Sequence, residues 1–197
     1  MDTLSLLKAS LCALDPTFFR NALRESYKKA AIPGLMDVQV PQEAVYQSEL
    51  ERILRTWLPS SVAVTPQSNA GGRKRSDIII VPSENHKILL ELVATAPAAN
   101  INEHFVSVTF CYCCPFQKYA LTFFFRRASE YGQYLGIKDV WVVHFTLKKN
   151  SDGFRYPFPD PLLGVNVLHV WHNFEFDEVI VKTAEKEERI TLLSAAR

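Results

Sequence analysis

Hydrophobic residues recur at helical spacing in three parts of the chain. Residues 3–31 are predicted to be helical, and Asp15 followed by Pro16 marks the start of a second helix within them. Residues 43–58 carry a single apolar stripe, which is typical of a helix packed on a core. A long helix is predicted over residues 116–135. The stripe in the second region consists of Tyr46, Leu50, Ile53, Leu54 and Trp57.

Short apolar runs between turn residues predict a sheet. Residues 76–81 and 87–94 are apolar, and the Pro-Ser-Glu-Asn turn between them predicts that they pair as antiparallel neighbours. Together with the helices, these strands describe an α/β fold in which helices flank a mixed sheet. The other strands are predicted over residues 61–65, 139–146 and 164–171, with a last edge strand over 179–183.

Length and composition suit one well-packed domain with a short lead-in. The 197 residues are 48% hydrophobic and 22% charged, which is sufficient for a core and argues against disorder. Turn residues at 32–34 end the first helical region. We therefore predict a helical lead-in over residues 1–40, compatible with the remnant of an upstream domain, and a main domain over residues 41–197.

Charge and cysteine content bear on the compartment and the partners. The net charge of +1 excludes a uniformly basic surface, so affinity for nucleic acid must come from local patches. Three of the four cysteines crowd into residues 111–114 and give no even disulfide framework. The first residues do not form a signal peptide, and no apolar run reaches the ~18 residues of a membrane-spanning helix. We expect an intracellular protein in a reducing compartment, with no membrane partner.

Two acidic residues interrupt the predicted strands. Asp77 opens the run Ser-Asp-Ile-Ile-Ile-Val, and Glu91 lies inside Ile-Leu-Leu-Glu-Leu-Val. An ionised carboxylate in apolar surroundings is costly unless it is paired or bound to a metal, and its oxygens suit Mg²⁺. If the strands are adjacent, both side chains converge at one edge of the sheet, with the Leu92 carbonyl as a third ligand. The alternative is that Asp77 caps a turn.

One glutamate and one histidine are placed near this pair. Glu49 falls at the rim of the apolar stripe on the preceding helix and would add an auxiliary carboxylate. His104 follows the second acidic strand and is the best-placed histidine for catalysis. His144 is instead predicted to be a core residue, and an odd offset sends His169 and His172 to opposite faces of their strand.

A basic segment precedes the first acidic strand. Residues 71–75 read Gly-Gly-Arg-Lys-Arg, and Arg73, Lys74 and Arg75 would contact a phosphate backbone if they lie beside the carboxylates. A solvated surface loop is the alternative for so short a charge run.

The order of the acidic residues resembles the PD-(D/E)xK nuclease superfamily. A Glu on a helix, an Asp at the start of a strand and a Glu on the next strand match over residues 43–145. The resemblance implies a restriction-endonuclease-like mixed sheet flanked by helices. It also implies Mg²⁺-dependent cleavage of nucleic acid, with DNA preferred to RNA.

Segments between residues 40 and 184 are similar to the C-terminal region of fungal Crinkler-type effector proteins. They include Val-Pro-Gln-Glu-Ala-Val-Tyr-Gln-Ser-Glu-Leu at 40–50, Leu-Glu-Leu-Val-Ala-Thr at 90–95 and Gly-Val-Asn-Val-Leu-His-Val-Trp-His-Asn at 164–173. The resemblance implies a host-directed effector with a host protein as partner and the host nucleus as destination. It also implies an upstream P-loop NTPase domain, whose motif is absent from this sequence. Residues 105–116, apolar where a basic helix is expected, resemble an insertion.

The main departure from the superfamily is a missing cation. The catalytic lysine would fall at Val93 and an arginine of the narrower family at Ala94, so the positive group must come from Lys87, Arg127 or His104. We therefore expect cleavage to be weak or absent. The alternatives are a catalytically silent module that binds nucleic acid or a host protein, and a truncated product without stable activity.

Overall fold

A seven-stranded mixed sheet forms the centre of the computed structural model, which describes residues 2–21, 27–32, 35–41, 43–70, 74–95, 116–147, 157–173, 175–176 and 178–192. The neighbours β5, β6 and β7 run parallel, and the other neighbouring pairs are antiparallel. This arrangement confirms the predicted α/β class and mixed sheet. In spatial order the strands are β3 (Ala63–Ala70), β4 (Lys74–Ser83), β5 (His86–Thr95), β6 (Asp139–Leu147), β7 (Val165–His172), β8 (Val179–Lys182) and β9 (Glu187–Ile190).

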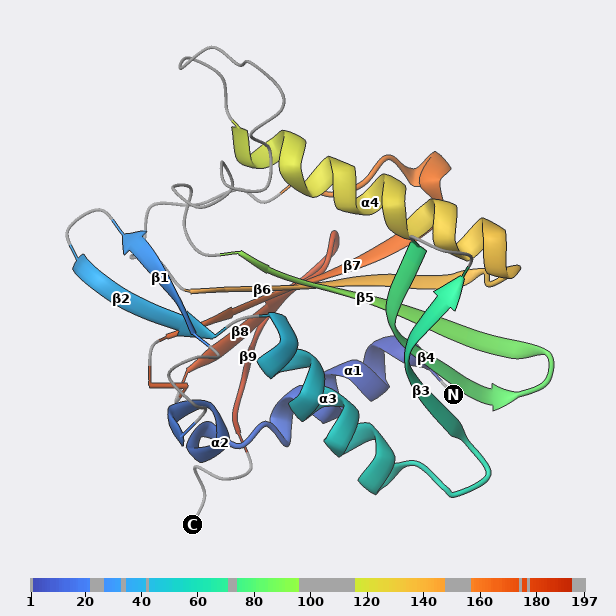
Figure 1. The fold of residues 1–197 in the computed structure, drawn as a ribbon, viewed down its shortest axis with the longest axis horizontal. Helices are drawn as coiled ribbons and strands as arrows, with labels where there is room; N and C mark the ends of the chain where they lie inside the picture. The colour runs from blue at the N-terminus through green and yellow to red at the C-terminus, as the bar shows by residue number, and fades with distance from the viewer. Residues whose placement is uncertain are drawn as a thin grey trace.

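Helices cover both faces of the sheet (Figure 1). On one face lie α1 (Thr3–Cys12) and α3 (Glu43–Trp57), and on the other lies α4 (Phe116–Leu135). Successive residues of a strand point to opposite faces, so β5 places Leu90 and Leu92 toward α3 and Leu89 and Val93 toward α4. Burial on both faces explains the continuous apolar runs of the parallel strands.

The helices near the sheet agree with the sequence pattern except at two aromatic positions. The bounds of α3 and α4 match the predicted helices. Trp57, which belongs to the predicted apolar stripe, is 45% exposed rather than packed in the core, and Phe123, which the apolar pattern of residues 116–135 also predicts to be a core residue, is 49% exposed. No helix among the described residues is long and apolar enough to cross a membrane.

The β4–β5 hairpin is the element that positions the acidic residues. Its antiparallel register runs from Ser83↔His86 to Ile78↔Leu90, which confirms the predicted pairing. The register of β4 with β3 continues further, to Lys74↔Ala70. In the described pairing, β4 therefore separates from β5 at Asp77 while it remains paired with β3.

The region before α3 differs from its prediction. Tyr27–Ile32 forms β1 and Leu35–Pro41 forms β2, a separate antiparallel pair where the end of a helical lead-in was expected. The intervening Pro-Gly is a strong turn signal, and cross-strand pairing overrides the weak helical propensity of this segment. The short α2 (Pro16–Asn21) does begin at the predicted proline. The boundary at residues 40–41 stays a prediction, although Leu7, Leu11, Leu14 and Phe19 belong to the α3-face core cluster.

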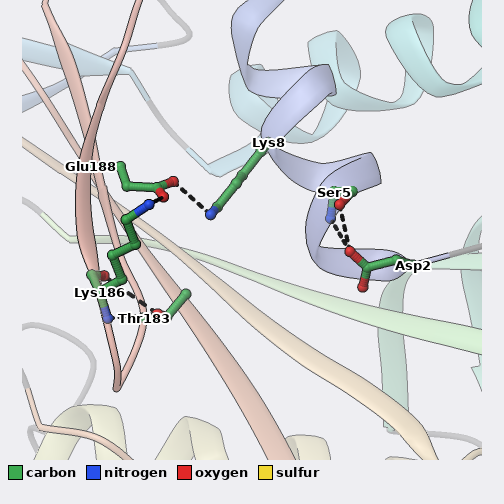
Figure 2. Close-up of polar contacts among 6 residues, drawn as sticks. All are labelled: Asp2, Ser5, Lys8, Thr183, Lys186 and Glu188. Carbon is green, nitrogen blue, oxygen red and sulfur yellow. Dashed lines mark hydrogen bonds and ion pairs between the residues drawn. The ribbon is translucent and has the colours of Figure 1, made fainter.

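Figure 2 shows how α1 is joined to the last strand. Lys8 Nζ lies 2.6 Å from Glu188 Oε2, and Lys186 pairs with the other oxygen of the same carboxylate. The two lysines lower the pKa of Glu188. Glu188 belongs to β9, which pairs with β8. The predicted edge strand at 179–183 therefore has a further neighbour and is not the edge.

Candidate functional site

Asp77 and Glu91 lie on the same face of adjacent strands. Asp77 is two residues from Ile79, and Glu91 is two residues from Leu89 and Val93, and all three apolar residues pack in the α4-face cluster. The two acidic residues are 6% and 0% exposed. Both predicted ligands are thus buried where β4 leaves β5.

Asp77 reaches across the gap between the separating strands. Its Oδ2 accepts a hydrogen bond from the backbone N–H of Leu92 at 2.6 Å. Burial raises the pKa of Asp77 to about 7, against the stabilising Leu92 N–H; the negative charge of Glu43 raises it further and the positive charge of Arg127 lowers it. A further positive charge beside this carboxyl group would therefore stabilise its ionised form.

Glu91 is paired with an arginine of the helix that covers its face of the sheet. The Nη2 atom of Arg127, on α4, contacts Glu91 Oε1. The guanidinium also lies 5.1 Å from the ring centroid of Phe124 and 5.7 Å from that of Tyr131, which are three residues before it and four after it on the same helix face. Glu91 Oε2 and Arg127 Nε have no hydrogen-bond partner among the described residues.

The first turn of α3 brings a third acidic residue, Glu43, near this pair, and the sequence analysis did not single it out. Gln47 Nε2 donates to the backbone oxygen of Asp77 at 3.1 Å and fixes α3 against β4. Glu43, one turn earlier on the same side of the helix, acts electrostatically on Asp77. The four-residue spacing of Glu43 and Gln47 was the available signal.

Glu49 does not share this site. Arg52 donates to both of its oxygens, each at 2.7 Å, and the Asp15 amide donates to Oε1 at 3.3 Å. Two residues turn a helix by about 200°, so Glu49 points nearly opposite to Gln47. This arrangement corrects the expectation that Glu49 faces the cleft of Asp77 and Glu91; it joins α3 to the start of α2 instead.

The predicted cations are only partly described. Arg73 and His104 lie outside the described residues, and Lys74 and Arg75 begin β4, paired with β3. Lys87 is exposed near the hairpin turn, roughly 13 Å along the strand from Glu91 at 3.3 Å per residue. Arg127 is therefore the candidate that the described structure brings to the carboxylates.

Val93 confirms that the strand itself offers no cation. It is 2% exposed and packs in the α4-face cluster, two residues beyond Glu91. Residues 105–115, where the sequence suggested an insertion, lie outside the described residues.

His144 on β6 is a core residue, as predicted, and His169 and His172 on β7 are buried as well. His144 Nδ1 lies 3.0 Å from His169 Nδ1, and His169 Nε2 lies 3.2 Å from the Pro157 oxygen. A carbonyl only accepts, which assigns N–H to His169 Nε2 and the shared hydrogen to His144 Nδ1. His172 lies on the other face, 2.7 Å from the hydroxyl of Tyr46. Burial lowers the pKa of all three histidines, to about 4 for His169 and His172.

The donor set partly fits a divalent cation. Within the described residues, no group of three or more His, Cys, Asp or Glu side chains is arranged around one point. Two buried carboxylates on one face, one of them with an unbonded oxygen, are nevertheless the kind of ligands that Mg²⁺ binds together with water. Asp77 and Glu91 would hold such an ion.

Comparison with known proteins adds little to this geometry. No protein-family model and no curated protein matches the chain. Among solved structures, the chain is similar to SfsA of Pyrococcus furiosus in complex with Ca²⁺, at a TM-score of 0.35 and 11% identity, over 78% of this chain and 67% of that one. So low a similarity carries no conclusion about function or metal, and the comparisons do not support the specific Crinkler-type resemblance.

Proposed function

We propose that the chain is a nuclease-like module that binds DNA and a divalent cation, most naturally Mg²⁺, at Asp77 and Glu91. The observation that carries the proposal is the placement of these two buried carboxylates on one face, at the point where β4 separates from β5. Burying two acidic residues lowers stability unless a positive partner is present. A site that retains them at this point has a use for a cation.

The residues of the chain would divide the work in a simple way. A bound Mg²⁺ would supply charge for a phosphate oxygen and a more acidic water. Asp77 and Glu91 would hold it, and Gln47 would keep α3 fixed against β4 through its hydrogen bond to the Asp77 backbone oxygen. Lys74 and Arg75, two to three residues before Asp77, would follow the phosphate backbone, together with Arg73. His104 stays a proposed auxiliary.

A binding module without catalysis is the second candidate. It is favoured by the contact of Arg127 with Glu91, because a guanidinium on this carboxylate stands where a metal would bind. The buried Val93 also leaves the strand without the superfamily's lysine. Such a module would bind nucleic acid or, as the Crinkler-type resemblance implies for an effector, a host protein.

A plasmid-nicking assay with and without Mg²⁺ separates the two candidates. We expect slow nicking that EDTA stops and that Asp77→Asn removes. The matched control is Glu84→Gln, which removes an exposed carboxylate in the turn between β4 and β5. Mg²⁺-independent nicking that survives Asp77→Asn contradicts the nuclease-like site. Metal-independent DNA binding without nicking favours the silent module.

A further inference from the structure

Arg127 stands between solvent and the buried carboxylates. Its side chain is 30% exposed, whereas that of Glu91, which it contacts, is 0% exposed. Phe124 and Tyr131 lie on either side of it along α4 and restrict where the guanidinium can go. The position of this cation is therefore set by the aromatic residues of its own helix face together with Glu91 of β5.

The charges around Arg127 do not allow it to leave without replacement. Asp77, Glu91 and Glu43 bring up to three negative charges to this part of the fold, and Arg127 acts on two of them. A buried carboxylate that loses its partner is strongly unfavourable. As long as it is ionised, Glu91 therefore needs a positive group beside it, either the guanidinium or an ion that replaces it.

We infer that Arg127 is a built-in counter-ion that a divalent cation must displace from Glu91, and that the released guanidinium then binds the nucleic-acid phosphate. This inference rests on the proposed function, because it takes the same two carboxylates as metal ligands. The partly exposed side chain gives Arg127 a route for that exchange, and its buried Nε has no hydrogen bond among the described residues to lose when it moves. Guanidinium groups bind phosphate through two parallel hydrogen bonds.

The exchange couples the two ligands. Phosphate that draws Arg127 away from Glu91 leaves the carboxylate open to metal, so nucleic acid tightens metal binding. By linkage, metal tightens nucleic-acid binding by the same factor. Without Arg127 the metal binds more tightly, and the coupling is lost.

Mn²⁺ binding, followed by the electron paramagnetic resonance signal of the free ion, tests the inference without any need for activity. The variants are Arg127→Gln and the control Arg126→Gln, which removes the neighbouring exposed cation of α4. We expect Arg127→Gln to bind Mn²⁺ about tenfold more tightly than the native chain, within the usual range of coupling between sites. Arg126→Gln should match the native chain. A DNA oligonucleotide should tighten Mn²⁺ binding by the native chain and not by Arg127→Gln.

Melting temperatures of the same variants test whether each of them folds. Arg127→Gln leaves Glu91 unpaired, so we expect a lower melting temperature without metal and a larger rise on adding Mn²⁺ than in the native chain. If this variant folds only with Mn²⁺, the inference is supported in the same way. Arg127→Lys keeps the charge but loses the planar fork, and we expect an intermediate Mn²⁺ affinity.

The outcomes separate this inference from the proposed function. Equal Mn²⁺ affinity in Arg127→Gln and the native chain overturns the inference, while Mg²⁺-dependent nicking by the native chain would leave the proposed function in place. Tighter Mn²⁺ binding by Arg127→Gln, with no DNA binding by the native chain, supports displacement and contradicts the proposed function. No Mn²⁺ binding by any variant overturns both.

Discussion

The carboxylate of Asp77 on β4 accepts a hydrogen bond from the backbone N–H of Leu92 on β5 at 2.6 Å, just beyond the pair Ile78↔Leu90. Where the two strands separate, the Asp77 side chain replaces a backbone carbonyl as the acceptor for the Leu92 N–H. The same bond turns Asp77 toward the residue that follows Glu91. Strand separation and the convergence of the two acidic residues are thus one structural feature, and its consequences can be measured.

Replacing Asp77 by Asn should stabilise the fold at neutral and alkaline pH. The pKa of Asp77 is raised to about 7 in the folded chain, mainly by burial. The folded state therefore binds the proton more tightly than the unfolded state, and native stability falls as pH rises from about 4 to about 7. At pH 8 the penalty is on the order of a few kcal/mol, and Asn avoids it while still accepting from Leu92.

Urea denaturation of both chains at pH 5 and pH 8 measures this effect. The gain from Asp77→Asn should be larger at pH 8. Asp77→Ala serves as the control, because it removes the charge and the acceptor together and leaves the Leu92 N–H unsatisfied. A gain that is the same at both pH values would show that Asp77 does not titrate as its burial implies.

The buried histidines should have the opposite pH dependence. Burial lowers the pKa of His169 to about 4, so the unfolded state binds its proton first and stability falls as pH drops from 6.5 to about 4. The full effect is roughly 3 kcal/mol at most for one histidine. His169→Gln, which cannot titrate, should flatten the fall in the free energy of unfolding over this range. The control is His86→Gln, at a half-exposed histidine that lies 3.3 Å from Asp139, and an equal slope in both variants would contradict the prediction.

Glu49 should matter for stability and not for function. Its carboxylate is buried and accepts from Arg52 and the Asp15 amide. Because Arg52 is 54% exposed, the loss in Glu49→Gln should be about 1–3 kcal/mol, below that of a fully buried ion pair. Glu51→Gln, which breaks the more exposed pair with Arg55, should cost less than about 1 kcal/mol. Loss of metal or DNA binding in folded Glu49→Gln would return Glu49 to the site.

Sequence patterns predicted the elements that have strong local signals. The helices α3 and α4 and the β4–β5 hairpin have clear periodicity or a clear turn and were found. The strands β1 and β2 were missed because their order comes from pairing with each other and not from residue preference. The neighbour of β8 was missed because β9 is short and highly charged.

The site was only half predictable for a related reason. Asp77 and Glu91 stand out because apolar strands rarely carry carboxylates. The contribution of α3 depends on its rotation against the sheet, which the apolar stripe defines too coarsely, so Glu49 was chosen in place of Glu43. Arg127 was one of three candidate cations, and only the packing of α4 on β5 distinguishes it from the others.

Replacing Val93 by Lys should restore the missing cation. Val93 is buried on the face of Glu91, two residues further along β5, so a lysine there extends toward the same carboxylates. A positioned positive group of this kind is worth on the order of 10²–10³ in rate, and Mg²⁺-dependent nicking should rise accordingly. Val93→Met adds similar length without charge and should leave nicking unchanged. Asp77→Ala in the Val93→Lys background should abolish the gain; nicking that rises equally with Met, or that survives Asp77→Ala, would place the chemistry elsewhere in the fold.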